Sequence, residues 1–336
     1  MRVGIIGAGR IGKVHAENIS RFIPEVEIKT VADPYMNEET EAFLKKNCGV
    51  KAVTREVADI ISDEQIEAVL ICSSTDTHSQ YIMEAANAGK HIFCEKPIDY
   101  ELKKVHEAIN TAKKAGVKLQ IGFCRRFDHN HKGVCDIVRS GKIGNVQMIK
   151  ISSRDPEPPA IEYIKVSGGI FYDMMIHDFD MARFLAGAEV AEVMAAGSVL
   201  IDPSIGEAGD VDTAMVMLKF ENGVIAVIDN SRKAVYGYDQ RVEVFGSKGC
   251  ARNENDTPNT VLVSDENCTS YANTYKVMWD RYTGAFVSEI RSFIDAVENN
   301  RDVPVTGEDG LYPVLMAAAA AKSLKEGRAV RISEIE

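Results

Sequence analysis

The sequence predicts a two-domain α/β protein. We expect an N-terminal Rossmann domain with a doubly wound parallel sheet, followed by an α+β domain with a large, open, mostly antiparallel sheet. Three observations support this fold class. The chain has 336 residues, which is too long for one ordinary hydrophobic core. Strand-like and helix-like segments alternate in its first part, whereas in the second part strand follows strand with tight turns between them. The predicted domains are residues 1–124 and 125–336, and the last helix of the second can pack on either domain.

A glycine-rich turn joins the first predicted strand to the first helix. An apolar strand ends at residue 6, and Gly7, Gly9 and Gly12 follow in the pattern GxGxxG. A second predicted strand ends at Asp33, about 20 residues after the last glycine, which is the spacing of a dinucleotide site. The alternative, a glycine turn with an incidental acid, does not explain why strand, turn, helix and acid occur together.

Each part of this motif has a physical role in binding a dinucleotide. Gly7 permits a tight turn, Gly9 lets the backbone approach a pyrophosphate, and Gly12 allows close packing of helix on strand. The helix N-terminus, which includes Arg10 and Ile11, offers free N–H groups to the phosphates. An acid at position 33 binds ribose hydroxyls and disfavours a 2′-phosphate, so the expected cofactor is NAD rather than NADP.

Further polar residues lie at or just beyond the ends of the next two predicted strands. Because the C-terminal ends of parallel strands border the ligand site, we expect these residues to line the cofactor cleft. They are Ser73, Ser74, Thr75, His78, Glu95 and Lys96. Lys96 precedes a proline, which keeps its backbone out of helical conformation at the rim of the sheet. The alternative for Lys96 alone is a solvated loop lysine.

The second half reads as a series of strands joined by turn signals such as residues 221–223 and 246–249. Sequential strands with tight turns predict an antiparallel sheet. The segment GGIFYDMMIHDFDMARFL, residues 168–185, is predicted to form a helix that covers one face of this sheet. Two late helices are expected near residues 284–298 and 310–326.

The predicted helix at 168–185 places Asp173, His177 and Asp180 on one side. A metal site, a structural hydrogen-bond pair and an acid–base pair all fit this spacing. Carboxylates and imidazole bind metals, but the chain has no HxxxH pair and this segment alone offers ligands, so no metal is expected. A structural pair between Asp173 and His177 within the core is the plainer alternative.

The acid–base interpretation of this segment fits the reaction of a dehydrogenase, which must move a hydroxyl proton as well as a hydride. The protein must supply orientation and a proton acceptor, and histidine titrates near neutral pH. A lysine ammonium near the reacting oxygen stabilises developing alkoxide charge. We therefore predict that Lys96 converges with Asp173 and His177 over the nicotinamide.

Several motifs together resemble the Gfo/Idh/MocA oxidoreductases over essentially the whole chain. They are the GxGxxG turn, CSSTDTH, CEKP, GFCRRFD, GGIFYDMMIHDFDMARFL and YGYDQRVEVFGSKG. The resemblance implies a Rossmann domain, an open-sheet second domain, NAD, and a homotetramer built through that sheet. It also implies Lys96, Asp173 and His177 as the catalytic set.

The details of SRDPEPP and MMIHDFDMARFL are similar to the inositol 2-dehydrogenase branch of this family. That branch implies oxidation of myo-inositol to 2-keto-myo-inositol, with His177 as general base. Further substrate contacts implied are Arg126, Asp155, Tyr236 and Tyr282. Arg126 is preferred to Arg125 because both are expected on a strand, where only one can face the cleft. The alternatives are another inositol, a related polyol or aldose, or a non-catalytic NAD-binding sensor.

The composition excludes several other classes. A net charge of −11 argues against nucleic acid as the main partner. No apolar run is long enough to span a membrane, and the N-terminus is a first strand rather than a signal peptide. The seven cysteines are odd in number and form no CxxC pair, which predicts reduced, mostly buried thiols in a cytoplasmic protein.

Overall fold

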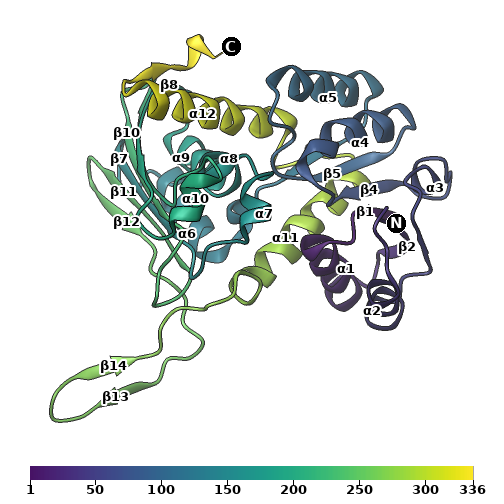
Figure 1. Ribbon diagram of the computed structural model, residues 1–336, viewed down its shortest axis with the longest axis horizontal. Coiled ribbons are helices and arrows are strands. Elements are labelled where there is room, and N and C mark those ends of the chain that lie inside the picture. Colours follow the sequence, from purple (N-terminus) through teal and green to yellow (C-terminus); the bar gives the residue numbers. More distant parts are fainter. Residues whose placement is uncertain (336) are drawn as a thin grey trace. The chain divides into compact units, whose positions relative to one another are not determined.

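The computed structural model describes residues 1–335 and contains two compact units (Figure 1). Unit 1 comprises Met1–Phe127 and Thr283–Val314, and unit 2 comprises Asp128–Tyr282 and Leu315–Glu336. Within residues 1–335, no helix is both long enough and apolar enough to cross a bilayer.

Unit 1 is built on a six-stranded sheet in the order β3-β2-β1-β4-β5-β6, and all neighbouring strands are parallel. The order reverses between β1 and β4, so this is the predicted doubly wound Rossmann sheet, with its ligand edge at the strand C-termini. The strands are β1 (Arg2–Ile6), β2 (Glu27–Ala32), β3 (Ala52–Thr54), β4 (Ala68–Ile71), β5 (His91–Glu95) and β6 (Leu119–Gly122). The connecting helices are α1 (Arg10–Phe22), α2 (Glu38–Cys48), α3 (Ala58–Ile61), α4 (Thr75–Asn87), α5 (Leu102–Ala115) and the 3₁₀ turn η1 (Cys124–Phe127).

Helix α11 (Met278–Glu298) begins earlier than predicted and contributes most of its length to unit 1. Val287, Ile290, Phe293 and Ile294 join the hydrophobic core formed by the first strands and helices. The ring of Phe293 packs on that of Phe93, with centroids 6.1 Å apart. The predicted division of the chain at residue 124 therefore differs from the compact units, because this late apolar stripe completes the first core rather than the second.

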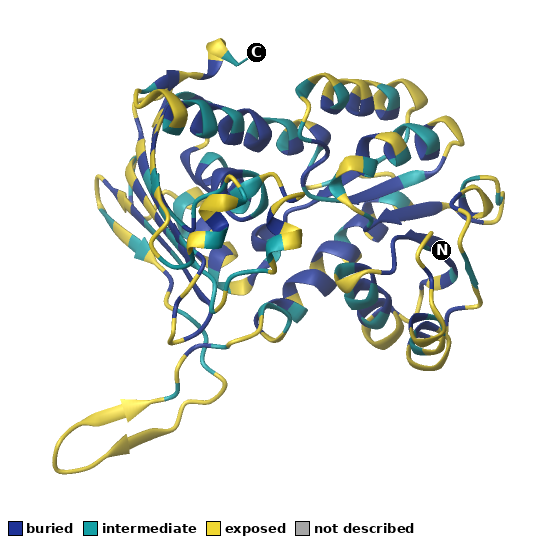
Figure 2. Ribbon diagram, viewed as in Figure 1, coloured by how far each residue is buried: buried dark blue, intermediate teal, exposed yellow. Residues whose placement is uncertain are grey.

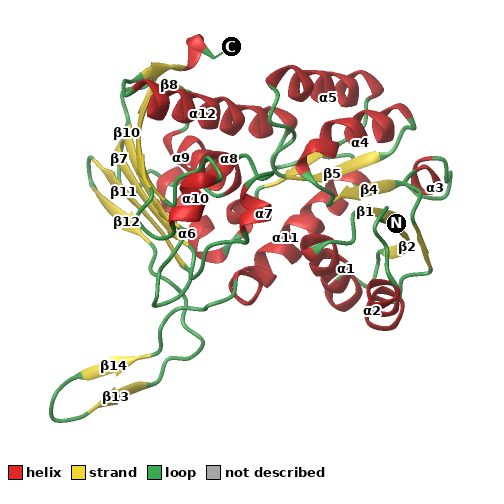
Figure 3. Cartoon of the chain, viewed as in Figure 1, coloured by secondary structure: helices red, strands yellow, loops and turns green. Residues whose placement is uncertain are grey.

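Unit 2 is built on a seven-stranded sheet in the order β12-β11-β7-β10-β9-β8-β15, in which only the β7–β10 pair is parallel (Figure 3). This matches the predicted open, mostly antiparallel sheet. Its strands are β7 (Val146–Arg154), β8 (Val190–Ser198), β9 (Thr213–Phe220), β10 (Ile225–Ser231), β11 (Asp239–Gly246), β12 (Gly249–Arg252) and β15 (Val330–Arg331), and a separate hairpin is formed by β13 (Leu262–Ser264) and β14 (Thr269–Tyr271). The remaining helices of unit 2 are α6 (His129–Arg139), α7 (Ile161–Ile164), α8 (Gly169–Asp173), α9 (Ile176–Ala186), α10 (Pro203–Glu207) and η2 (Ile332–Glu334). Helix α12 (Gly307–Glu326) belongs to unit 1 up to Val314 and to unit 2 from Leu315.

Helix α9 covers one face of this sheet, as predicted, and a buried acid fixes the contact. Asp178 is fully buried and accepts hydrogen bonds from Ser153 Oγ of β7 (2.5 Å) and Asn230 Nδ2 of β10 (2.9 Å). Inward and outward residues alternate along β7, β9 and β10, with the inward set buried (Figure 2). Asp178 is therefore a structural residue between helix and sheet.

Asp128 organises a second buried polar cluster in unit 2. Its carboxylate caps α6 by accepting from the His131 backbone N–H (3.0 Å), and it also accepts from His131 Nδ1 (2.7 Å) and from Arg281 Nη1 (2.5 Å). Burial acts to raise the pKa of Asp128, but hydrogen bonds from His131 and Arg281 outweigh it and hold the pKa below the ordinary value of 3.8. The cluster thus stabilises the ionised carboxylate.

We expect Asp128→Ala to lower the free energy of unfolding by about 3–5 kcal/mol, because it leaves the buried Arg281 charge with less compensation. Urea unfolding of the variant measures this loss. Asp136→Ala, on the exposed side of the same helix, is the control and should cost less than about 1 kcal/mol. The pKa of Asp128 is lower in the folded state than in the unfolded state. Its contribution to the free energy of unfolding is therefore present above pH 3.8 and is lost as the pH falls below that value. Equal stability of the two variants at neutral pH would contradict this account.

Candidate active site

The glycine turn has the close approaches that a dinucleotide loop requires. Gly7 has φ +100°, and a Cβ there would lie 2.6 Å from the carbonyl carbon of Cys72 and the backbone nitrogen of Ser73. A Cβ on Gly12 would collide with the Gly7 carbonyl oxygen. Gly9 is the N-cap of α1, and a Cβ there would meet no atom within 4 Å. The first and third glycines are therefore fixed by packing, while the second leaves the helix N-terminus uncovered.

The N-terminus of α1 fits the pyrophosphate of NAD. Arg10 and Ile11 are its first two residues, and Arg10 is exposed. Beside them, Asp33 Oδ2 accepts a hydrogen bond from the Ala8 backbone N–H (2.7 Å) and Oδ1 accepts from the Tyr35 N–H (2.8 Å). The carboxylate that should bind ribose hydroxyls is thus held against the same turn that should bind the phosphates.

His78 connects the segments that follow β4 and β5. Its Nδ1 lies 2.7 Å from the Pro97 carbonyl oxygen and its Nε2 lies 3.0 Å from the Ser73 carbonyl oxygen. Because carbonyl oxygens only accept, the ring forms both bonds when both nitrogens carry hydrogen. Burial lowers the pKa of His78, while the two carbonyl bonds and the charge of Glu95 act in the opposite direction. The net effect is a lowered pKa, which favours the neutral ring, so His78 donates to one of the two carbonyl oxygens and lies in contact with the other.

The other predicted cofactor residues lie at these same strand ends. Ser73 Oγ is 2.7 Å from Thr77 Oγ1, and Ser74 is the N-cap of α4, whose first residue is Thr75. Glu95 is the last residue of β5, and Lys96 follows it with a half-buried side chain and a cis peptide bond to Pro97. The structure thus groups the predicted residues of unit 1 along one edge of its sheet.

The helix predicted at 168–185 is in fact two helices, so that prediction was wrong. Helix α8 ends at Asp173 and α9 begins at Ile176, with His177 as its second residue. The backbone N–H groups of both Met174 (3.1 Å) and Met175 (2.8 Å) donate to the carbonyl oxygen of Ile170. This shared acceptor interrupts the regular i to i−4 ladder, so the two catalytic candidates lie on different helices.

Asp173 is held by two residues that the sequence argument did not identify. Its Oδ1 accepts from the Tyr163 hydroxyl (2.8 Å), and its Oδ2 lies 3.4 Å from Arg232 Nη1. Arg232 is fully buried and also donates from Nη2 to Asp210 Oδ2 (3.1 Å). Asp210 accepts in turn from the Ile170 N–H (3.0 Å). This chain of bonds fixes the carboxylate of Asp173, and the single positive charge of Arg232 is shared between Asp173 and Asp210.

The glycine pair at the start of α8, Gly168 as N-cap and Gly169 as first residue, makes this arrangement possible. Gly169 has φ +79°, and a Cβ there would lie 2.7 Å from Asp210 Oδ1. A side chain at that position would be strained and would push Asp210 away from the start of α8. The pair of glycines in the sequence indicates that another group approaches the backbone closely at this point. No feature of the sequence near Asp210 indicates that its carboxylate is that group.

Among the predicted substrate residues of unit 2, Asp155 is bonded through its backbone to the segment that leads to Tyr236. The carbonyl oxygen of Asp155 accepts from the Ala234 N–H (2.6 Å), two residues before Tyr236. The Tyr236 hydroxyl donates to Asp239 (2.6 Å), and burial, with that bond, raises its pKa. Tyr282, by contrast, is only 1% exposed and packs edge-on against Tyr238.

Arg126 does not lie on a strand, and that part of the prediction was wrong. Strand β6 ends at Gly122, and a 3₁₀ turn follows in which Arg125 and Arg126 are both buried. Arg126 Nη2 donates to Asp309 Oδ1 at 3.0 Å. The guanidinium is thus engaged with an acid of the same unit, and its substrate role stays a prediction.

Comparisons with known proteins agree with these features. Residues 1–123 match the family described as "Oxidoreductase family, NAD-binding Rossmann fold", and residues 131–252 match the "GFO/IDH/MocA C-terminal domain". The chain is 47% identical to the myo-inositol 2-dehydrogenase of Thermotoga maritima over 100% of this chain and 99% of that protein. It is 43% identical to the inositol 2-dehydrogenase of Rhizobium meliloti over 99% of both.

A solved structure gives the same result for the fold. The scyllo-inositol dehydrogenase of Lactobacillus casei, solved with bound NAD(H) and scyllo-inositol, superimposes with a TM-score of 0.92. It is 32% identical and is covered over 99% of both chains. Together with the glycine turn and the strand-end residues, these matches identify the chain as a member of the Gfo/Idh/MocA family of oxidoreductases, with an NAD-binding Rossmann domain.

Proposed function

We propose that this protein is an NAD-dependent dehydrogenase that oxidises myo-inositol to 2-keto-myo-inositol. The observation that carries this proposal is the full-length similarity to a protein named myo-inositol 2-dehydrogenase, combined with the presence of Lys96, Asp173 and His177. When bound, NAD supplies the hydride acceptor, and the residues of the chain orient the substrate and move the proton.

Each of the three residues has a distinct role in this proposal. His177 accepts the proton of the reacting hydroxyl as general base. Lys96 stabilises the negative charge that develops on the same oxygen. Asp173, already held by Tyr163 and Arg232, accepts from a neighbouring substrate hydroxyl and orients the imidazole.

A neutral cyclic polyol suits the polar groups available for the substrate. Every ring hydroxyl needs a hydrogen-bond partner when it is buried. Asp155 and Tyr236 are proposed to provide such partners in addition to Asp173 and His177. Arg126 and Tyr282 remain weaker candidates, because Arg126 is bonded to Asp309 and Tyr282 is buried against Tyr238.

The experiment that tests the substrate is a comparison of kcat/KM for myo-inositol, scyllo-inositol and glucose with NAD. The proposal expects the highest value with myo-inositol. A higher value with scyllo-inositol, the ligand of the Lactobacillus casei structure, would keep the mechanism and replace the substrate. Tight NAD binding without turnover of any of them would favour the sensor alternative.

We further propose that the protein is a cytoplasmic homotetramer assembled through the seven-stranded sheet. The face opposite α9 carries exposed apolar side chains in register: Phe245, Met148 and Ile225 are directly paired on β11, β7 and β10. Met194 and Met217 are paired on β8 and β9. Exposed apolar rows of this kind are typical of interfaces. The seven free cysteines, five of them buried, support the cytoplasm as location.

Met217→Glu is expected to convert the tetramer into smaller species, because it places a charge in the centre of the proposed interface. Analytical ultracentrifugation of the purified protein measures the assembly. Met217→Leu, which keeps the apolar character and similar volume, is the control and should remain tetrameric. A tetramer that survives Met217→Glu unchanged would place the interface elsewhere.

A further inference from the structure

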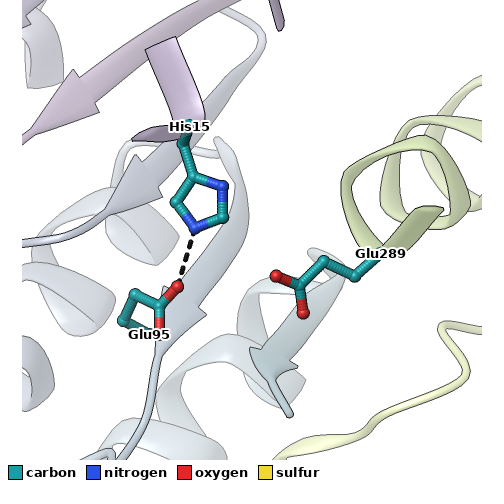
Figure 4. A group of neighbouring side chains, drawn as sticks. All are labelled: His15, Glu95 and Glu289. Atoms are coloured by element: carbon teal, nitrogen blue, oxygen red, sulfur yellow. Dashed lines mark hydrogen bonds and ion pairs between the residues drawn. The ribbon is translucent and has the colours of Figure 1, made fainter. Parts of the chain in front are cut away.

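Three titratable side chains from distant parts of the sequence meet in the core of unit 1 (Figure 4). They are His15 of α1, Glu95 of β5 and Glu289 of α11, and one ligand atom from each lies within 4.8 Å of the other two. His15 and Glu289 are fully buried. The sequence argument missed this cluster because it considered acid–histidine groups only around residues 173–180.

The histidine already has a partner within the cluster, whereas the second acid has none. His15 Nε2 donates to Glu95 Oε1 at 2.7 Å. Both carboxylate oxygens of Glu289 are buried without a hydrogen bond. Figure 4 shows them directed toward Glu95 and His15. An ionised carboxylate in that position would be an uncompensated buried charge beside a second carboxylate, which is strongly unfavourable.

The surroundings of the cluster are apolar and aromatic. The rings of Phe93 and Phe286 contact the His15 ring edge-on, with centroids 5.4 and 5.6 Å away. In such an environment a carboxyl group takes up a proton rather than remain charged. Burial, followed by the charge of Glu95, raises the pKa of Glu289 well above its ordinary value.

A metal ion is the other way to compensate two carboxylates, but the geometry does not favour one. The distance of 2.7 Å between His15 Nε2 and Glu95 Oε1 is that of a hydrogen bond rather than of two ligands on one ion.

We propose that Glu289 is a neutral carboxylic acid that donates a hydrogen bond to the Glu95 carboxylate, so that Glu289 and His15 together position Lys96. Glu95 Oε2 also lies against Gly122, where a Cβ would be 3.2 Å from it. In this proposal Glu95 is held by His15 from α1 and by Glu289 from α11. Lys96 is the next residue, so its backbone is fixed by this anchor. The positioning part rests on the catalytic role proposed above for Lys96.

Infrared spectroscopy tests the neutral state without reference to activity. The difference spectrum between wild type and Glu289→Gln at neutral pH should contain the carbonyl band of one protonated carboxylic acid. Its absence would overturn the proposal. Elemental analysis of the purified protein tests whether the cluster binds a metal ion instead. One tightly bound ion per chain in wild type, lost in Glu289→Gln, would also overturn the proposal.

The pH dependence of stability gives a second test. A Glu289 that stays protonated when folded ionises near 4.5 when unfolded, so the folded state binds the extra proton above that pH and its stability falls as pH rises. Glu289→Gln has no such group, so its stability does not fall with pH for this reason. The Tm of Glu289→Gln minus that of wild type should therefore increase from pH 5 to pH 8. The other titratable groups near the cluster are His15, His78, Glu95, Lys96, Cys72 and Cys94, and all of them are present in both proteins. The comparison therefore reports Glu289 together with its effect on these neighbours. A Tm difference that stays constant with pH would contradict the assignment.

Three variants separate positioning from simple folding. Glu289→Leu keeps side-chain volume but cannot donate, and it should lower kcat by about tenfold or more through displacement of Lys96. Glu289→Gln, which can donate, should recover most of that loss. Glu298→Gln, an exposed change on the same helix, is the control.

A reagent that acylates amines reports on Lys96 even if no inositol is turned over. The labelling rate of Lys96 in the NAD-bound protein, read by mass spectrometry, should change in Glu289→Leu and return toward wild type in Glu289→Gln. Equal rates in all three proteins would overturn the positioning role. Failure of the proposed function would instead appear as wild-type protein that binds NAD, labels as expected and oxidises no inositol.

Discussion

Lys96→Met should lower kcat by about 10²- to 10³-fold, with little change in the Kd for NAD. Methionine keeps about the length of the lysine side chain but removes the ammonium that we propose to stabilise the developing alkoxide, and loss of one such donor typically costs this much. Lys96 also directly follows Glu95 at the end of β5, so the backbone at this position is well anchored and the variant should fold normally. Steady-state kinetics with myo-inositol, together with NAD titration, measures both quantities.

The matched control for this variant is Lys103→Met, because Lys103 is a solvent-exposed lysine on α5. It should leave kcat and NAD binding unchanged. If Lys96→Met bound NAD normally and turned over at the wild-type rate, the proposed catalytic set would be wrong. If it lost NAD binding instead, Lys96 would be a cofactor residue rather than a stabiliser of the alkoxide.

His177→Ala is expected to lower kcat by about 10²- to 10⁴-fold, the range in which general base catalysis contributes. His177 lies at the start of α9, where the helix begins anew after the break at Met174 and Met175. The side chain is proposed to accept the hydroxyl proton. Its removal should therefore reduce the chemical step at neutral pH and flatten the pH dependence of kcat/KM, which a purely structural residue would not do.

The control is His106→Ala, which removes an exposed histidine from α5. Added imidazole should restore part of the activity of His177→Ala, because it can occupy the space left by the side chain and accept the proton. An alanine variant with wild-type kcat and an unchanged pH profile would show that His177 pairs with a structural group instead.

The parts of the fold that follow from local pattern were predictable. The order of apolar strand, glycine turn and helix led to the parallel sheet of unit 1, and the position of Asp33 beside the glycine turn was expected from its spacing. The strand series of the second half likewise led to the mostly antiparallel sheet. Most paired strands in the two sheets are also consecutive in the sequence, so local pattern carries much of the information. The pairs β1–β4, β7–β10, β7–β11 and β8–β15 are the exceptions.

The parts that depend on distant partners were not predictable. Arg126 pairs with Asp309, and His15 meets Glu289, in both cases through a segment that returns to unit 1 near the end of the chain. Glu289 occupies a position on the buried, otherwise apolar face of α11. An acid at such a position was the feature of the sequence that could have indicated the cluster. The break between α8 and α9 occurs where the carbonyl oxygen of Ile170 accepts from two backbone N–H groups. The spacing of apolar side chains does not predict such a backbone feature.

The proposed mechanism requires Lys96 and His177 to act on one substrate hydroxyl. A crystal structure of the protein with NAD and myo-inositol tests it most directly. The account predicts that Lys96 Nζ and His177 Nε2 both lie about 3 Å from the same inositol oxygen, with an Asp173 oxygen at hydrogen-bond distance from a neighbouring hydroxyl. An inositol bound with either side chain far from the oxygen nearest the nicotinamide would contradict it.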